Sequence, residues 1–225
     1  MTEMERRQAS LGAYLDAAAR GDRIAYVSSL NALDWPTAWI EAFGDIVHLG
    51  RVHPNTQRIF ELQWQGLLVR GNPHPPSGIS IPQIFLDHVS LLVDALRVLL
   101  PPLVNEAPDV IYRGQSVSDY EDGLVGFSWT PHPALAEMYA RDPIMNDFPR
   151  LVLAHFEPAN AILGTIEGTE FVVDPRLIID PKVICRPRDI FAPGQSVDDL
   201  MKQCELRPLQ DIATQALSLL NPRGV

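Results

Sequence analysis

The chain has 225 residues, of which 46% are hydrophobic and 20% charged, and its net charge is −10. This composition excludes an intrinsically disordered chain, and the length is sufficient for a substantial hydrophobic core. The net negative charge argues against broad binding to nucleic acid, because such binding needs many Lys and Arg side chains on phosphates.

The first hundred residues show the spacing of amphipathic helices. Helices are predicted over residues 3–19, 22–33, 36–43, 55–69 and 81–100. The first is expected to end at Gly21, and residues 71–78, rich in glycine and proline, are expected to form a loop. The last helix must end at Pro101, because proline has no backbone N–H to continue it.

After Pro102 the sequence changes to short apolar runs separated by Gly, Pro and Asp, which is typical of strands. Strands are predicted at Val110–Tyr112, Leu124–Trp129, Leu151–Phe156, Phe171–Val173, Leu177–Ile179 and Val183–Cys185. One short helix at 133–141 interrupts them, and helix is expected again at 197–203 and 208–220. The predicted fold class is α+β, with a helical region over 1–105 followed by a strand-rich region over 106–225.

The two cysteines, Cys185 and Cys204, are too few for a disulfide framework and have no neighbouring histidines for a metal site. The first residues show no apolar signal-peptide segment, and charged residues interrupt the most apolar stretch, 79–104. We therefore expect a cytoplasmic protein without a metal or a membrane partner, with delivery into another cell left open.

Three short motifs in the second half carry side chains suited to chemistry. Tyr112-Arg113-Gly114 ends a predicted strand and offers a planar guanidinium beside a backbone that a ligand can approach. Such a group binds phosphate or carboxylate with paired hydrogen bonds. Taken alone, the motif is more often an arginine that pairs with a neighbouring carboxylate.

The second motif is Gly126-Phe127-Ser128-Trp129-Thr130, followed by an alanine-rich helix. In a strand Ser128 and Thr130 point to one face and Trp129 to the other. Two adjacent hydroxyls can orient a carboxylate or a sugar hydroxyl. Thr130 with Pro131 is equally a normal helix start, in which the threonine caps the helix.

The third motif is Glu167-Gly168-Thr169-Glu170, which precedes the apolar strand Phe171–Val173. A carboxylate at the entrance of such a strand can be held rigidly. Alone it would be an ordinary charged residue that protects a sheet edge.

In this order the three motifs resemble the Arg–Ser–Glu (cholera-toxin-like) class of ADP-ribosyltransferases. The resemblance covers about residues 108–185, with 15 residues from Arg113 to Ser128 and 42 from Ser128 to Glu170. In that class an arginine on one strand, a hydroxyl motif on another and a strand-borne glutamate line a NAD cleft. The resemblance implies a β-sandwich catalytic domain over 106–225 that uses NAD as a substrate and needs no metal.

The resemblance also implies roles for single residues. Glu170 would be the catalytic carboxylate, and Ser128 and Thr130 would shape the pocket for the nicotinamide ribose and orient that carboxylate. No Gly-x-Ser-x-Gly elbow, dinucleotide-fold fingerprint or P-loop supports a different catalytic class.

Arg113 would bind NAD through a phosphate or a ribose, and Gly114 and Trp129 would also contact NAD. Tyr139, on the helix after the hydroxyl motif, would stack on nicotinamide or adenine, although packing in the core explains it equally well. Nearby carboxylates would repel the pyrophosphate and make the arginine more necessary: Glu121, Asp122, Glu137 and Asp174.

The activity implied is that of a mono-ADP-ribosyltransferase, which cleaves NAD at the nicotinamide–ribose bond and transfers ADP-ribose to a macromolecular acceptor. Small members of the class act as bacterial or phage-related toxins and effectors. Two departures, Trp129 within the hydroxyl motif and Gly168 where many protein-modifying members carry Glu or Gln, leave the acceptor open as a protein or a specific nucleic acid.

The alternative is a non-enzymatic module on the same scaffold that binds NAD, ADP-ribose or a protein. For the helices of 1–105 we expect recognition of a target or partner, since the motifs lie only in the second half. A neutralising or regulatory partner is left open.

Overall fold

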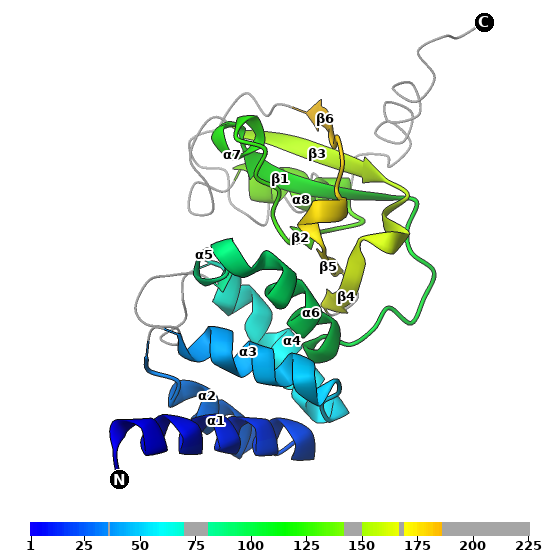
Figure 1. Cartoon of the computed structure of the whole chain (residues 1–225). Helices are drawn as coiled ribbons and strands as arrows, with labels where there is room; N and C mark the ends of the chain where they lie inside the picture. Colours follow the sequence, from blue (N-terminus) through cyan, green and yellow to red (C-terminus); the bar gives the residue numbers. More distant parts are fainter. Residues whose placement is uncertain (36, 70–80, 142–149, 167–168, 186–225) are drawn as a thin grey trace, which may run out of the picture. The chain divides into compact units, whose positions relative to one another are not determined.

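The structure, a computed structural model, describes residues 1–35, 37–69, 81–141, 150–166 and 169–185 (Figure 1). It is an α+β protein in which a series of helices precedes two small antiparallel sheets. The chain divides into two compact units, which are described separately: Met1–Val104 with Leu163–Glu167, and Asn105–Ile162 with Gly168–Val225. The loop predicted at 71–78 and the helices predicted at 197–203 and 208–220 lie outside the described residues.

The helices of the first unit follow the predicted order. Their bounds are α1 (Glu3–Arg20), α2 (Arg23–Asn31), α3 (Ala38–Leu49), α4 (Pro54–Val69), α5 (Ile81–Ile84) and α6 (Val89–Leu99). At the start of α1, Thr2 and Glu5 exchange side-chain and backbone hydrogen bonds as a capping box. At its end Gly21 adopts a left-handed conformation with φ 70°, which confirms the predicted stop.

The single helix predicted over 81–100 is broken. A 3₁₀ turn, Leu86–His88, separates α5 from α6, and all three side chains of this turn are exposed. The predicted apolar stripe is otherwise correct, because Phe85, Leu96 and Leu99 are fully buried.

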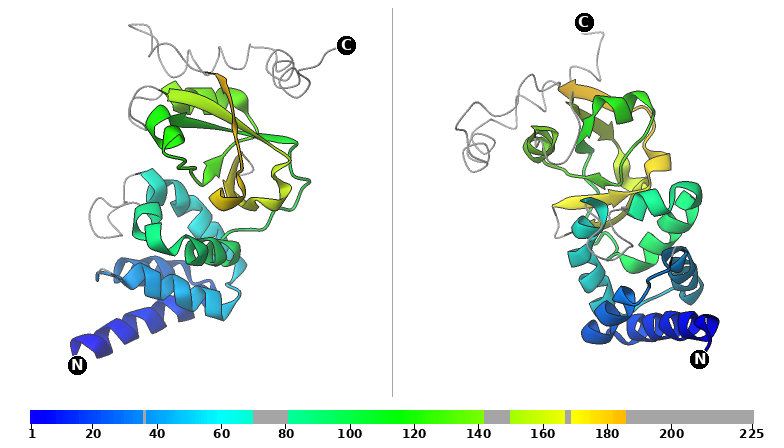
Figure 2. Two further views of the ribbon diagram at one scale, coloured as in Figure 1. Left: turned by 45° about the horizontal axis from the view of Figure 1, so that its top comes forward. Right: turned by 90° about the vertical axis from the view of Figure 1, so that its left-hand side faces the viewer.

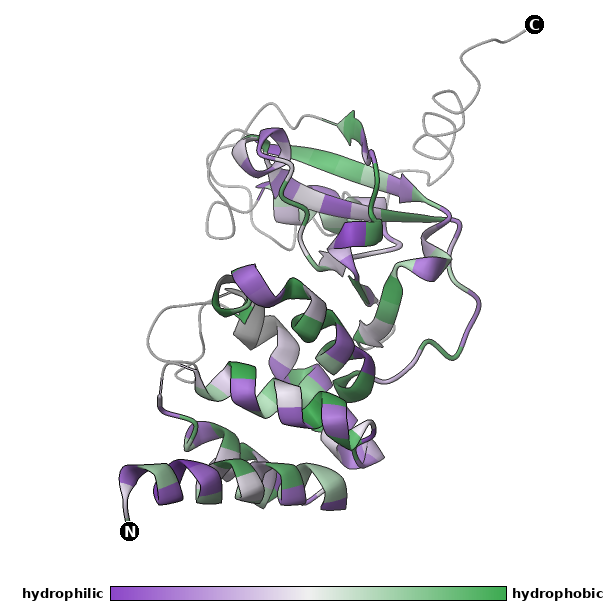
Figure 3. Ribbon diagram, viewed as in Figure 1, coloured by the Kyte–Doolittle hydropathy of each residue, from purple (hydrophilic) through white to green (hydrophobic). Residues whose placement is uncertain are grey.

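Aromatic rings form much of the core of the first unit. Phe43 of α3 contacts Phe60 of α4 and Phe85, with ring centroids 6.2 and 5.1 Å apart. Trp39 and Trp64 extend the group at its two ends. Hydrophilic and hydrophobic residues alternate along these helices (Figure 3), as expected of helices that bury one face.

The strands that follow the helices form two three-stranded sheets (Figure 2). The first sheet has the order β1 (Val110–Ser116), β3 (Arg150–Phe156), β6 (Lys182–Cys185), and the second has the order β2 (Ser128–Trp129), β5 (Glu170–Val173), β4 (Ile162–Ile166). β1 pairs with β3 from Val110 opposite Phe156 to Ser116 opposite Arg150. A single bridge between Tyr112 and Thr130 joins β1 to the chain directly after β2.

One helix, α8 (Pro133–Arg141), packs on the first sheet. Ala136 and Ala140 of α8 form an apolar cluster with Tyr112, Val152 and Ala154. The strand and the helix are so close at Gly114 that a Cβ there would lie 2.5 Å from the oxygen of Ala136 and from the nitrogen of Ala140. One face of β1 is therefore covered by α8.

Two predicted strands differ from the structure. The run Leu124–Trp129 is strand only at its last two residues. The predicted strand Leu177–Ile179 is wrong, because the 3₁₀ turn Pro175–Leu177 forms instead. Asp174 starts that turn by accepting a hydrogen bond from the Arg176 backbone, and Pro175 fixes the turn geometry.

One helix and one strand, together with the 3₁₀ turn Pro158–Asn160, were not predicted. The helix α7 (Val117–Glu121) is capped by Ser116, which accepts from the backbone N–H of Asp119. The strand β4 belongs largely to the first unit, where a Cβ on Gly164 would lie 2.7 Å from both Leu100 Cβ and the oxygen of Pro101.

Candidate functional site

Arg113 projects from the middle of β1 and is half-buried. Its Nη1 donates to the main-chain oxygen of Ser128 at 2.7 Å, and its Nε donates to Oε1 of Gln115 at 3.0 Å. Within the part of the chain that the structure describes, these are the hydrogen bonds of this side chain. The guanidinium is therefore held against the hydroxyl motif of β2, which follows it by 15 residues.

Two carboxylates act electrostatically on Arg113. Burial lowers the pKa of its guanidinium, while the charges of Glu170 and Asp119 raise it in part. The guanidinium remains a cation at every ordinary pH. A half-buried cation attracts an anion more strongly than a fully exposed arginine would, since less water screens its charge.

Ser128 lies at the start of β2 and is half-buried. Its hydroxyl oxygen is withdrawn from solvent and makes no hydrogen bond with any of the described residues. A buried hydroxyl without a hydrogen bond costs free energy, so this group can accept a partner from outside the described residues. A sugar hydroxyl or an amide of a bound ligand would satisfy it.

Glu170 is the first residue of β5, directly after Thr169. Antiparallel pairing places Trp129 opposite Phe171, so the next pair in the same register would be Thr130 opposite Glu170. Thr130 is buried, and its Oγ1 donates to the oxygen of Thr169 at 3.0 Å. Thr130 thus ties the end of β2 to the residue before Glu170, whose Oε1 is itself buried.

The interpretation of Thr130 as a helix cap is wrong. α8 begins at Pro133, and the Thr130 hydroxyl accepts from the backbone N–H of His132 at 3.2 Å rather than from the first turn of the helix. The hydroxyl therefore donates one hydrogen bond, to Thr169, and accepts one, from His132. The arrangement suits the part of the sequence prediction in which Thr130 orients the glutamate.

Three predicted ligand-binding residues have other surroundings. The approach to Gly114 that the sequence suggested for a ligand is made by the backbone of α8 instead. Trp129 is 1% exposed, with its indole N–H donating to the oxygen of Gly126 at 2.9 Å and its ring edge-on to His155. Tyr139 is half-buried on α8. The roles of these residues in binding remain predictions, and the burial of Trp129 leaves almost none of its ring to contact a ligand.

Two residues next to Arg113 were given no role in the sequence analysis. Gln115 is 1% exposed and joins Arg113 to the oxygen of Leu124, to which its Nε2 donates at 2.6 Å. Gly126 lies directly against the guanidinium. The guanidinium occupies the space into which any other residue at position 126 would place its Cβ. In a strand a residue two positions beyond the arginine lies on the same face, which places Gln115 beside Arg113.

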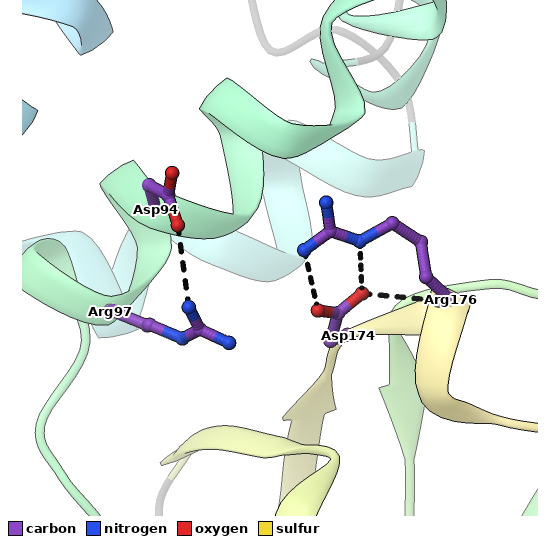
Figure 4. A network of polar contacts seen from close by, with 4 residues as sticks. All are labelled: Asp94, Arg97, Asp174 and Arg176. Atoms are coloured by element: carbon purple, nitrogen blue, oxygen red, sulfur yellow. Dashed lines mark hydrogen bonds and ion pairs between the residues drawn. The ribbon is translucent and has the colours of Figure 1, made fainter.

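Two of the carboxylates expected to repel a pyrophosphate are already paired. Glu137 binds Arg141 at 2.5 Å one turn along α8. Asp174, 1% exposed, accepts from Nε of Arg176 at 2.8 Å and from its Nη2 at 2.7 Å (Figure 4). Such paired hydrogen bonds neutralise much of the local charge. The acidic surroundings of Arg113 are thus weaker than the sequence suggested.

Other features of the described residues add little to the site. They contain no group of three or more His, Cys, Asp and Glu side chains placed to hold a metal ion. None of their helices combines the length and apolar character needed to cross a membrane. Comparisons with protein-family models, with curated proteins and with solved structures find no match to this chain.

Proposed function

We propose that the chain is a mono-ADP-ribosyltransferase that uses NAD and transfers ADP-ribose to a macromolecular acceptor. The observation that carries the proposal is the convergence of Arg113, Ser128 and Glu170 from β1, β2 and β5. These three residues span 57 positions of the sequence, and the arginine interacts with both of the others. They are also the three positions on which the sequence resemblance rests.

The arrangement suits cleavage of the bond between nicotinamide and ribose. As that bond breaks, nicotinamide leaves with the electron pair and positive charge develops on the ribose, as in glycoside cleavage. A fixed carboxylate at Glu170 stabilises charge that is absent in the ground state. The nucleophile of the acceptor then forms the new bond and gives up its proton. Positively charged nicotinamide is a good leaving group, so the step needs no covalent intermediate.

The other two residues contribute binding. The guanidinium of Arg113 suits a phosphate or a ribose of NAD, and the buried hydroxyl of Ser128 suits a polar group of the nicotinamide ribose. Thr130 holds the chain next to Glu170 through Thr169. In this proposal β1 and β2 carry the residues that bind NAD, and β5 carries the glutamate that stabilises the positive charge on the ribose.

The test is incubation of the purified chain with NAD labelled in its adenine, together with a whole-cell extract that is afterwards divided into protein and nucleic-acid fractions. Label in one fraction with the wild type, and none with Glu170→Gln, would support the proposal and name the acceptor class. The matched control is Glu106→Gln, which removes an exposed carboxylate of the same unit and should label as the wild type does.

A second candidate is a module on the same scaffold that binds NAD or ADP-ribose without turnover. It would show a rise in melting temperature with NAD but no label and no free nicotinamide. A ligand at 100 times its dissociation constant stabilises the folded state by about 2.7 kcal/mol, which is readily measured. Recognition of a target by the helices of 1–105 remains a prediction, since no described contact bears on it.

A further inference from the structure

The side chain of Gln115 connects Arg113 to the loop that precedes β2. Its amide accepts from Nε of Arg113 at 3.0 Å and donates to the oxygen of Leu124 at 2.6 Å, and the residue is 1% exposed. The two ends of an amide differ chemically, since only the oxygen accepts and only the nitrogen donates. The two partners therefore fix which way the amide faces, and with it the direction of the Arg113 Nε–H.

Gly126 closes the same arrangement from the other side. A Cβ on this residue would overlap Nη2, Cζ and Nε of Arg113, so the guanidinium fills the space that a side chain at position 126 would need. The oxygen of Gly126 accepts from the buried indole of Trp129 at 2.9 Å, which anchors the loop over the guanidinium. Arg113 is thus enclosed between Gln115, the backbone of Gly126 and the oxygen of Ser128.

We propose that Gln115 and Gly126 are positioning residues that hold the Arg113 guanidinium in a single orientation toward the dinucleotide. The inference deepens the proposed function and rests on it for the identity of the ligand. A free arginine side chain loses considerable rotamer freedom when it binds. In this chain the Arg113 side chain is already ordered on folding. Binding of NAD therefore carries no further entropic cost for ordering it.

The first arm of the test measures the orientation of Arg113 without any ligand. In the wild type we expect a resolved NMR signal for the Arg113 Nε–H, shifted by its hydrogen bond and slow to exchange with water. Gln115→Leu should abolish the shift and the protection. Gln115→Glu, which accepts from Nε but cannot donate to Leu124, should keep the shift. A wild-type signal that is averaged and unprotected would overturn the proposal.

The second arm measures nicotinamide release from NAD. Gly126→Ala should raise KM for NAD by about tenfold or more with kcat largely kept, because the arginine is displaced while Glu170 is not. The control Gly12→Ala adds the same methyl group at a helix position with nothing within 4 Å and should leave both constants unchanged. An unchanged KM for Gly126→Ala, or an equal loss in kcat, would contradict the proposal.

The two arms separate the possible failures. If the wild type neither releases nicotinamide nor gains stability from NAD, the proposed function is wrong, and the fixed orientation of Arg113 is judged by the NMR arm alone. If the wild type is active but Gln115→Leu retains a protected Nε–H and a normal KM, the positioning proposal is wrong and the proposed function stands.

Discussion

Arg113 donates a 2.7 Å hydrogen bond to the main-chain oxygen of Ser128, and this contact joins the first two motifs of the sequence directly. It uses the backbone of Ser128 and leaves the serine hydroxyl, which is buried, without a hydrogen bond among the described residues. The guanidinium is thus held by the chain itself, and under the proposed function the hydroxyl would bind the ligand.

Replacing Arg113 with lysine is expected to weaken NAD binding about tenfold or more. Lysine keeps the charge but loses the planar fork that reaches Gln115 and Ser128 together, and hydrogen bonds to a charged group contribute about 1.5–3 kcal/mol each. Isothermal titration calorimetry with NAD measures the change. Arg51→Lys, on an exposed arginine, is the matched control and should bind as the wild type does.

Thr130→Val should lower the free energy of unfolding by about 1–3 kcal/mol, since the oxygen of Thr169 and the N–H of His132 both lose their hydrogen bond to Oγ1. Denaturant unfolding measures this loss. Thr130→Ser keeps the hydroxyl and should restore part of the stability. If the valine variant is as stable as the wild type, Thr130 does not hold the start of β5.

The half-buried His155, whose ring meets Trp129 at 6.4 Å between centroids, should make stability depend on pH. Burial lowers the pKa of His155 below its ordinary value of 6.5. The unfolded chain therefore binds a proton first as the pH falls, and the folded state loses stability from about pH 6.5 down through the lower folded pKa. Melting temperatures from pH 7.5 to 5 should show a smaller decline for His155→Gln, and equal declines would contradict the assignment.

Gly114→Ala should be one of the more destabilising single-methyl additions in this chain. The new Cβ would meet the backbone of α8, which cannot rotate away as a side chain can, and overpacking of this kind costs about 1–3 kcal/mol. Gly12→Ala is the opposite case, because a mid-helix alanine with open space around it should add about 0.5–1 kcal/mol. Thermal unfolding of the two variants gives the comparison, and equal melting temperatures would show that α8 can move.

Local signals were sufficient for much of the fold. The stop of α1 at Gly21 and the apolar face that includes Phe85 and Leu96 follow from a few neighbouring residues, and both agree with the structure. The α+β fold class follows from the change after Pro102, where helical spacing gives way to short apolar runs. The prediction failed where side chains compete for backbone groups. The oxygens of Leu124 and Gly126 accept from Gln115 and Trp129, so the run before Ser128 does not form a strand.

The candidate site could be proposed from the sequence by residue type, whereas its contacts could not. Order and spacing pointed to Arg113, Ser128 and Glu170. Ser128 lies within a predicted strand, whereas Arg113 and Glu170 were expected next to strands that in the structure extend to include them. The roles of Gln115 and Gly126 depend on a loop folding back onto β1, and no periodicity reports such a contact. Likewise the bond between Thr130 and the oxygen of Thr169 joins residues 39 positions apart, beyond the reach of local patterns.

The proposed activity is measured most simply as the rate at which the purified chain releases nicotinamide from NAD, compared among the wild type, Glu170→Gln and Glu106→Gln. We expect release by the wild type and by Glu106→Gln, and a fall on the order of 100-fold or more for Glu170→Gln with an unchanged melting temperature. Release by Glu170→Gln at the wild-type rate would contradict the central claim.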